Sequence, residues 1–157
     1  MTRYKATAQG QIPFTADEEA EWDAMEAAQR AQVQARELPE FLAYVDAQVD
    51  AIYIAVQGER ITEYMLAESE ATAYKTAGYK GTVPGSVASW AAAKGKDARW
   101  ACDDILTTAA SWRYMQNMLR AQRLAIKEQA KTSPSLAPLR TKFDGFVVGV
   151  KQKLGIA

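Results

Sequence analysis

Histidine is absent from this chain of 157 residues, and cysteine occurs once. Without histidine the chain lacks the commonest general base, the commonest metal ligand, and the Ser-His and Cys-His pairs of covalent catalysis. A single cysteine excludes a disulfide within the chain and any metal site built from several thiolates. These absences argue against an enzyme, so we predict no catalytic residue, no cofactor and no metal.

Long apolar runs and an excess of one charge are also missing. No stretch of about eighteen apolar residues is present, so no membrane-spanning helix is expected. The opening residues 1–14 lack the apolar segment of a secretory signal, and we expect a protein made and used in a reducing cytoplasm. Nineteen basic residues balance nineteen acidic ones, so no overall field attracts nucleic acid or an anionic membrane.

The charges are balanced in number but unevenly distributed. Residues 1–40 carry eight acids and four bases, whereas residues 113–157 carry nine bases and two acids. This asymmetry indicates either pairing within the molecule or separate partner surfaces, and we favour the former. A basic ridge on one predicted helix consists of Arg113, Arg120, Arg123 and Lys127. Covering apolar surface and pairing with acids explain this ridge better than binding to nucleic acid.

The longest uninterrupted helical pattern spans residues 97–131 and organises the chain. It contains neither proline nor glycine, so nothing in it forces a break. Asp97 is a plausible N-cap. Apolar residues recur every seven positions, which predicts a single buried stripe: Ala98, Ile105, Trp112, Leu119 and Ile126. A continuous helix of this length would be roughly 50 Å long, which favours an elongated bundle or an assembly.

The N-terminal part, residues 1–37, is predicted to be a β-hairpin followed by a connecting helix. Residues 3–14 alternate between apolar and polar side chains around Gln9-Gly10, as in a short hairpin. Thr15 and Glu18 form a capping-box pattern that starts a helix at Ala16. We expect this helix to end near Arg36, because Pro39 is typical of the first turn of a new helix. Its apolar residues are mostly alanine, so it has fewer large apolar side chains than a core helix normally has.

Residues 38–131 are predicted to form a helical bundle, with residues 132–157 as a linker and a C-terminal amphipathic helix. Helices are expected from Pro39 to Gln57 and from about Glu59 to Ala77. Because only Gly58 separates them, these two helices should form an antiparallel hairpin. The inward residues of the second helix are predicted to be Ile61, Tyr64, Met65, Ala71 and Tyr74. The predicted fold class is therefore mainly α, an elongated helical bundle with a short N-terminal β-hairpin.

Few residues in this pattern invite a chemical role. Asp103 and Asp104 are adjacent, so on a helix they point about 100° apart. Asp46 and Asp50 share a face but lack a second element to meet them. The glycine-rich loop 78–85 lacks the Gly-Lys-Ser/Thr ending of a phosphate loop, so we interpret it as a bend between helices.

The single thiol and the tryptophans also favour structural roles. Cys102 lies on the inward side of the long helix, which favours a buried, inert thiol. The alternative is a disulfide between two chains. Trp90, Trp100 and Trp112 are more typical of core or interface aromatics than of a platform for stacking bases.

Two stretches resemble a known family. YKATAQGQIPFTADEEAEWDAMEA, residues 4–27, resembles the start of small proteins encoded beside tail-fibre genes in tailed bacteriophages and prophages. Residues 63–128 are similar to the helical part of such proteins, with the pattern A-Y-K-x-A-G-Y-x-G-x-V-P-x-x-V-x-S-W-A at residues 73–91. The resemblance covers somewhat over half of the chain. It implies a fibre assembly protein without catalytic residues, acting on trimeric, β-rich fibre chains.

The resemblance and the absent chemistry together predict a tail-fibre assembly chaperone that binds the fibre protein. The partner-binding residues are predicted to be Tyr4, Ile12, Phe14, Trp22, Tyr79, Val83 and Trp90. One alternative is a structural subunit of the tail fibre or baseplate, retained in the virion and possessing a self-associating bundle. A weaker alternative is a DNA-binding packaging accessory, supported by the basic ridge alone. The expected location is the host cytoplasm during assembly, with the virion tail as the alternative end point.

Overall fold

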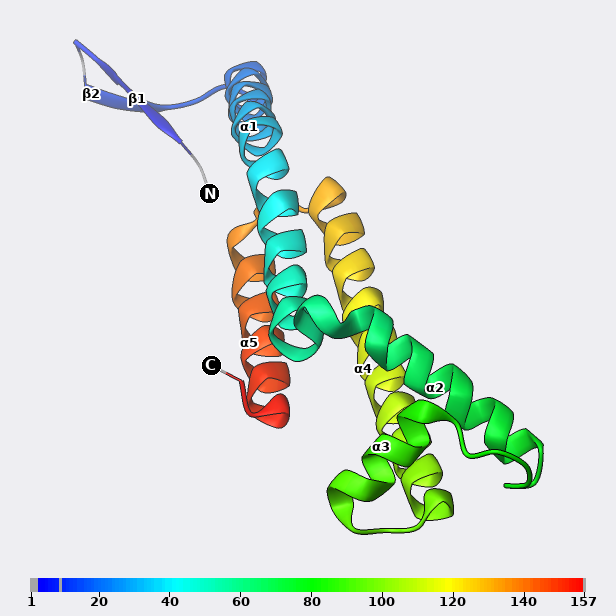
Figure 1. The fold of residues 1–157 in the computed structure, drawn as a ribbon. Coiled ribbons are helices and arrows are strands. Elements are labelled where there is room, and N and C mark those ends of the chain that lie inside the picture. The colour runs from blue at the N-terminus through cyan, green and yellow to red at the C-terminus, as the bar shows by residue number, and fades with distance from the viewer. Residues whose placement is uncertain (1–2, 9, 157) are drawn as a thin grey trace.

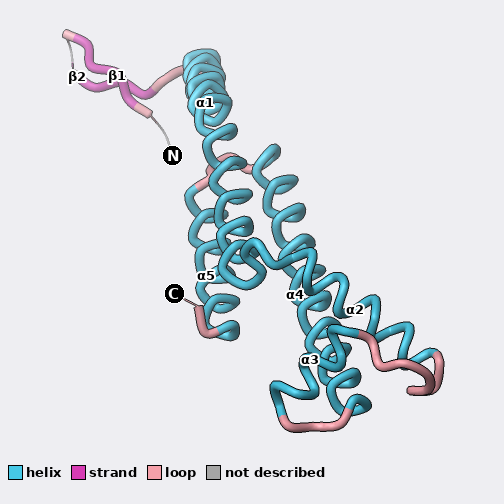
Figure 2. Tube along the Cα trace, in the orientation of Figure 1, coloured by secondary structure: helices cyan, strands magenta, loops and turns pink. Residues whose placement is uncertain are grey.

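A computed structural model describes residues 3–8 and 10–156 of the chain, and it confirms a mainly α fold with a short N-terminal hairpin (Figures 1 and 2). The elements follow one another as β1 (Tyr4–Thr7), β2 (Gly10–Pro13), α1 (Ala16–Gln57), a 3₁₀ turn (Gly58–Arg60), α2 (Ile61–Thr76), α3 (Gly85–Lys94), α4 (Ala98–Thr132) and α5 (Ala137–Leu154). The molecule is elongated, with the hairpin at one end and α2, α3 and the start of α4 at the other. No helix in the described part of the chain is long and apolar enough to cross a membrane.

The N-terminal hairpin forms as its alternating pattern predicts. β1 and β2 are antiparallel, with Tyr4 opposite Pro13 and Lys5 opposite Ile12. The predicted turn at Gln9-Gly10 is described only in part, because Gln9 lies outside the described residues and Gly10 begins β2. Phe14 donates its backbone N–H to the carbonyl of Arg3 at 2.9 Å, which extends the ladder by one bond.

The predicted break in the first helix is wrong, because α1 continues through Pro39 to Gln57. The capping box at Thr15 is present and starts the helix where expected. Pro39 has no N–H to donate to the carbonyl of Ala35, which would be costly inside a core. Both residues are exposed, so water can satisfy that carbonyl. The residues that face the bundle, Leu38 and Phe41, keep helical spacing across the proline.

Only the second half of α1 is covered by the bundle. Residues 16–33 are exposed except for three half-buried glutamates that face the hairpin, and we call this segment the distal half of α1. Contact with the bundle is marked by Gln34, whose Nε2 donates to the carbonyl of Ala130 at 3.1 Å. Figure 1 shows the distal half standing clear of the other helices with the hairpin at its tip. At 1.5 Å per residue this segment is about 27 Å long.

The predicted antiparallel pairing of the two helices around Gly58 is also wrong. The 3₁₀ turn redirects the chain, with Gly58 at φ 53° and ψ −140°. The chain therefore leaves α1 at an oblique angle instead of reversing (Figure 1). α2 packs against α4 and α3. A short connection limits the distance between two helices but does not fix the angle between them.

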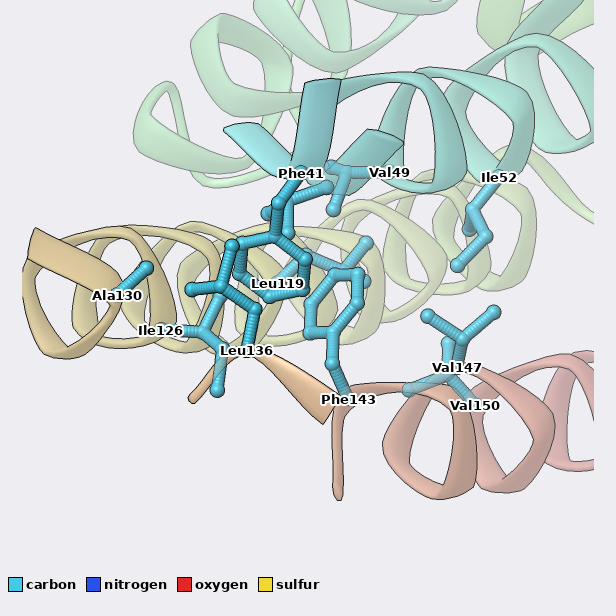
Figure 3. Close-up of a cluster of buried hydrophobic side chains, with 11 residues drawn as sticks. Phe41, Val49, Ile52, Leu119, Ile126, Ala130, Leu136, Phe143, Val147 and Val150 are labelled. Carbon is cyan, nitrogen blue, oxygen red and sulfur yellow. The ribbon is translucent and has the colours of Figure 1, made fainter. Parts of the chain in front are cut away.

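α4 carries both hydrophobic cores of the molecule. The first core joins the second half of α1, the second half of α4, and α5 (Figure 3); its buried residues include Val45, Val49, Leu119, Ile126, Phe143 and Val147. The second core joins α2, α3 and the first half of α4; its buried residues are Ala71, Tyr74, Val87, Ala91, Ala101 and Cys102. The prediction that residues 97–131 organise the chain is confirmed. Asp97 caps the helix by accepting from the backbone N–H of Trp100 at 2.7 Å.

The C-terminal helix forms as predicted, and it starts one residue before Pro138. Pro138 lies in the first turn of α5, and a missing N–H in the first turn of a helix costs nothing. α5 is fixed against α1 by the hydroxyl of Tyr44, which donates to Asp144. The Arg140 guanidinium lies 4.0 Å from the centre of the Tyr44 ring. The hydrogen bond to Asp144 raises the pKa of Tyr44.

Candidate functional site

The predicted partner-binding residues fall into two groups at opposite ends of the molecule (Figure 1). The hairpin group lies on the hairpin and the start of α1; it consists of Tyr4, Ile12, Phe14 and Trp22. The loop group lies on the loop between α2 and α3 and on α3 itself; it consists of Tyr79, Val83 and Trp90. The structure therefore does not bring all seven residues into one site.

The hairpin group is the more accessible of the two. Tyr4 is 60% exposed and Ile12 is 42% exposed. Residues opposite each other in a hairpin share a face, so Tyr4 lies on one face with Pro13, and Ile12 lies on the other with Lys5. Phe14 packs edge-on against Trp22, with ring centroids 5.9 Å apart. Both faces of the ribbon thus offer an apolar side chain, and the aromatic pair anchors its base.

Arg3 ties the hairpin to α1. Its backbone N–H and its guanidinium both donate to Glu19, at 2.8 and 2.6 Å, and the guanidinium also reaches Asp23 at 2.8 Å. Lys5 forms a further ion pair with Glu18 on the same helix. Charge-assisted contacts of this kind are short and directional. They give the hairpin a defined position on the helix, which a lone two-stranded ribbon would not keep.

These contacts shift the carboxylates toward their charged forms. The backbone and side-chain donors of Arg3 lower the pKa of Glu19. Lys5 and the backbone N–H of Thr15 lower the pKa of Glu18. The indole N–H of Trp22, which donates at 3.0 Å, and Arg30 lower the pKa of Glu26. The shifts at Glu18 and Glu19 favour the docked hairpin when these carboxylates are ionised, whereas the two largest causes at Glu26 lie on α1 itself.

We therefore expect acid to release the hairpin before the bundle unfolds. A lowered folded-state pKa contributes stability above the unfolded glutamate pKa of about 4.3, and this stability is lost as the pH falls through the lower folded values. The nuclear magnetic resonance signal of the Trp22 indole N–H, compared with the far-ultraviolet helix signal, should show an acid transition at a higher pH than the loss of helix. In an Arg3→Ala variant this early transition should disappear. A single transition common to both signals in the parent chain would contradict the docking.

The loop group is engaged inside the molecule. The Tyr79 hydroxyl donates to Asp103 at 2.7 Å, and its ring packs edge-on against Tyr74. Tyr79 has a positive φ of 59°, a backbone conformation that few residues other than glycine adopt. Val83 packs against the second core, and the Trp90 indole N–H donates to Asp104 at 2.8 Å. These residues hold the loop on α4 and offer little free surface.

Cys102 is fully buried in the second core, as the inert-thiol interpretation expects. Its Sγ lies 3.1 Å from the carbonyl oxygen of Ala71, and burial raises the pKa of the thiol. Both effects suppress the reactive thiolate. A disulfide between two chains would require α2 to move away from α4.

We expect Cys102 to react with a maleimide only when the second core opens. Labelling of the native chain, followed by mass spectrometry, should be slow and should accelerate with denaturant in step with unfolding. The Ser69→Cys variant offers a matched exposed thiol on α2, and it should be labelled rapidly under native conditions. Equal native rates at the two positions would contradict the burial of Cys102.

The acidic pairs and the basic ridge are used largely in internal contacts. Asp103 accepts from Lys75 at 2.7 Å, and Asp46 pairs with Lys127 at 2.6 Å. Arg123 lies 3.8 Å from Asp46. Within residues 3–8 and 10–156, no cluster of acidic, cysteine or histidine side chains could hold a metal ion. An open groove lies between α1 and the linker that leads into α5, and polar side chains of α1 form much of its lining.

Sequence reasoning missed two features. The first is the Arg3 tie, because nothing in an isolated arginine indicates which carboxylates it will meet. The second is the exposure of Ile61, Tyr64 and Met65, which were predicted to point inward but are 43%, 45% and 64% exposed. That prediction assumed that α1 would cover them, and α2 does not fold back along α1.

Comparison of the chain with protein-family models, with curated proteins and with solved structures found no match.

Proposed function

We propose that this protein is a tail-fibre assembly chaperone that binds the fibre chain through its hairpin and the adjoining distal half of α1. The observation that supports this most directly is the placement of an exposed hairpin at the tip of a helical segment free of the bundle (Figure 1). The other support is the resemblance of the sequence to phage tail-fibre-associated proteins.

A short exposed ribbon suits a β-rich client. In a sheet of two strands, each strand has an outer edge, and β1 and β2 pair only with each other in the part of the chain that the structure describes. An extended client segment can add to such an edge through backbone hydrogen bonds. The exposed Tyr4 and Ile12 would contact side chains on the two faces of the added strand. Fibre chains with many non-local strand pairings fold slowly and expose such edges while incomplete.

Apolar side chains extend the proposed surface along α1. Trp22, Met25 and Val33 on the distal half are 40%, 57% and 41% exposed. Large exposed apolar side chains grouped on one segment are typical of binding surfaces. The bundle would then serve as a rigid base from which this segment reaches the client.

Co-expression with the neighbouring fibre gene tests the proposal. Soluble trimeric fibre is expected only when the protein is present. A Tyr4→Ser, Ile12→Ser double variant should lose this effect, because it keeps the fold but removes the apolar contacts. Tyr114→Ser is a matched control at a position 72% exposed on α4, and it should behave like the parent. Equal fibre solubility with and without the protein would contradict the proposal.

A structural virion subunit is the second candidate. Exposed apolar side chains on α2, far from the hairpin, favour a chain that remains in a lasting assembly. Mass spectrometry of purified particles separates the two candidates. A fixed ratio of this protein to fibre protein would favour the virion subunit, and its absence would favour a chaperone that acts in the host cytoplasm and leaves.

A further inference from the structure

The molecule exposes far more surface than a compact protein of its size. Its solvent-accessible surface is 10801 Å², whereas a folded monomer of 17.3 kDa is expected to expose about 7,800 Å². The difference is about 3,000 Å², and a standard protein interface covers about 800 Å² on each partner. The surplus is therefore large enough for a second interface in addition to a client site on the hairpin.

A particular part of this surface is more apolar than an exposed helix should be. We define the corner surface as the exposed apolar side chains where α1 ends and α2 begins: Ile54, Ile61, Tyr64, Met65 and Leu66. Ile54 is 71% exposed and Leu66 is 56% exposed. Leu66 points away from Tyr64 on the helix, so the start of α2 is apolar on more than one side. Such a helix is normally covered on more than one side.

The corner surface continues a face that the protein already buries. Tyr64, Ala67, Ala71 and Tyr74 follow one another at spacings of three and four, which places them on one side of α2. Ala71 and Tyr74 are buried in the second core, and Ala67 is half-buried. Tyr64 is 45% exposed, so the same face loses its cover toward the start of the helix. A partner placed there would extend the existing packing.

The charges beside the corner surface fit a second copy of the same chain. In a two-fold dimer the same patch meets itself, so a patch of one sign would repel its copy. Glu59, Arg60 and Glu63 border the corner surface with both signs. A two-fold arrangement can therefore bring Arg60 near an acid of the other copy.

The corner surface is also well separated from the proposed client site. Ile54 lies 21 positions after Val33, the last apolar residue of the proposed client site, which corresponds to about 32 Å of helix. A fibre segment bound at the hairpin would not cover it. We infer that the corner surface is the interface of a two-fold dimer of this chain. This inference goes beyond the proposed function and does not depend on it.

Light scattering with size-exclusion chromatography on the full chain tests the inference. The parent protein is expected at twice 17.3 kDa at micromolar concentration. Met65→Glu should weaken the dimer by at least about 30-fold, as for a residue central to an interface. Met25→Glu is the matched control, because Met25 is 57% and Met65 is 64% exposed on a helix. The control should remain dimeric, and circular dichroism should show both variants folded.

Several outcomes would overturn the inference. A parent chain that stays monomeric at high concentration would do so, and so would a trimer or larger assembly. Dissociation by Met25→Glu but not by Met65→Glu would place the interface on the distal half of α1 instead. The fibre-solubility assay keeps the two proposals apart. A dimer that fails to solubilise fibre would contradict the proposed function alone, and a monomer that solubilises fibre would contradict the dimer alone.

Discussion

Replacing Phe143 with alanine is expected to lower the free energy of unfolding by about 3–5 kcal/mol. Phe143 is 2% exposed and lies in the first core, where it joins α5 to α1 and α4. Figure 3 shows its ring pointing from α5 toward Leu119. Truncation would remove the burial of the ring and leave a cavity that straight helices cannot close.

Denaturant unfolding followed by circular dichroism measures this loss. The midpoint should fall while the dependence on denaturant stays the same, because the surface exposed on unfolding changes little. Tyr114→Ala is the matched control, since Tyr114 is 72% exposed and its loss should change stability by less than about 0.5 kcal/mol. Equal effects of the two substitutions would contradict the position of Phe143.

Replacing Pro39 with alanine is expected to stabilise the protein by up to about 3 kcal/mol. Alanine restores a backbone N–H that can donate to the carbonyl of Ala35, and it removes the clash of the proline ring with that carbonyl. Pro39 is exposed within α1, so the substitution removes no core contact. The thermal midpoint and the helix signal should both rise.

Ala43→Pro is the reciprocal control for this prediction. Ala43 is also exposed on α1, one turn later, and a proline there should destabilise by about 3 kcal/mol or more. A loss of stability in Pro39→Ala would contradict a continuous helix at this position. It would instead support the break that the sequence pattern predicts.

Local features were predictable because they depend on neighbouring residues. The capping box at Thr15, the N-cap at Asp97 and the alternation in residues 4–13 each act within a few positions. The break at Pro39 was wrong because packing of the surrounding apolar face outweighed the local preference of proline. That packing joins residues far apart in the sequence, so it cannot be predicted from a local sequence pattern.

The candidate site was predictable only in part. Exposure of Tyr4 and Ile12, which lie on opposite faces, follows from a two-stranded hairpin whose faces are not packed into a core. The internal roles of Tyr79 and Trp90 depend on Asp103 and Asp104, which come from a different helix. The spacing of residues along the chain does not show which carboxylate each of these side chains will meet, or at what distance. The direction of α2 after Gly58 was equally invisible, and it determines which apolar residues remain uncovered.

Because the distal half of α1 continues the helix of the bundle without a break, the hairpin points in a fixed direction around the axis of α1. Each added residue rotates the tip by 100° and advances it by 1.5 Å. A seven-residue insertion near Arg30 would nearly restore the original direction, with a drift of about 20°, and would only lengthen the reach. A two-residue insertion would point the hairpin toward the opposite side. Any client that touches both the tip and the base must therefore match this helix in phase as well as in length.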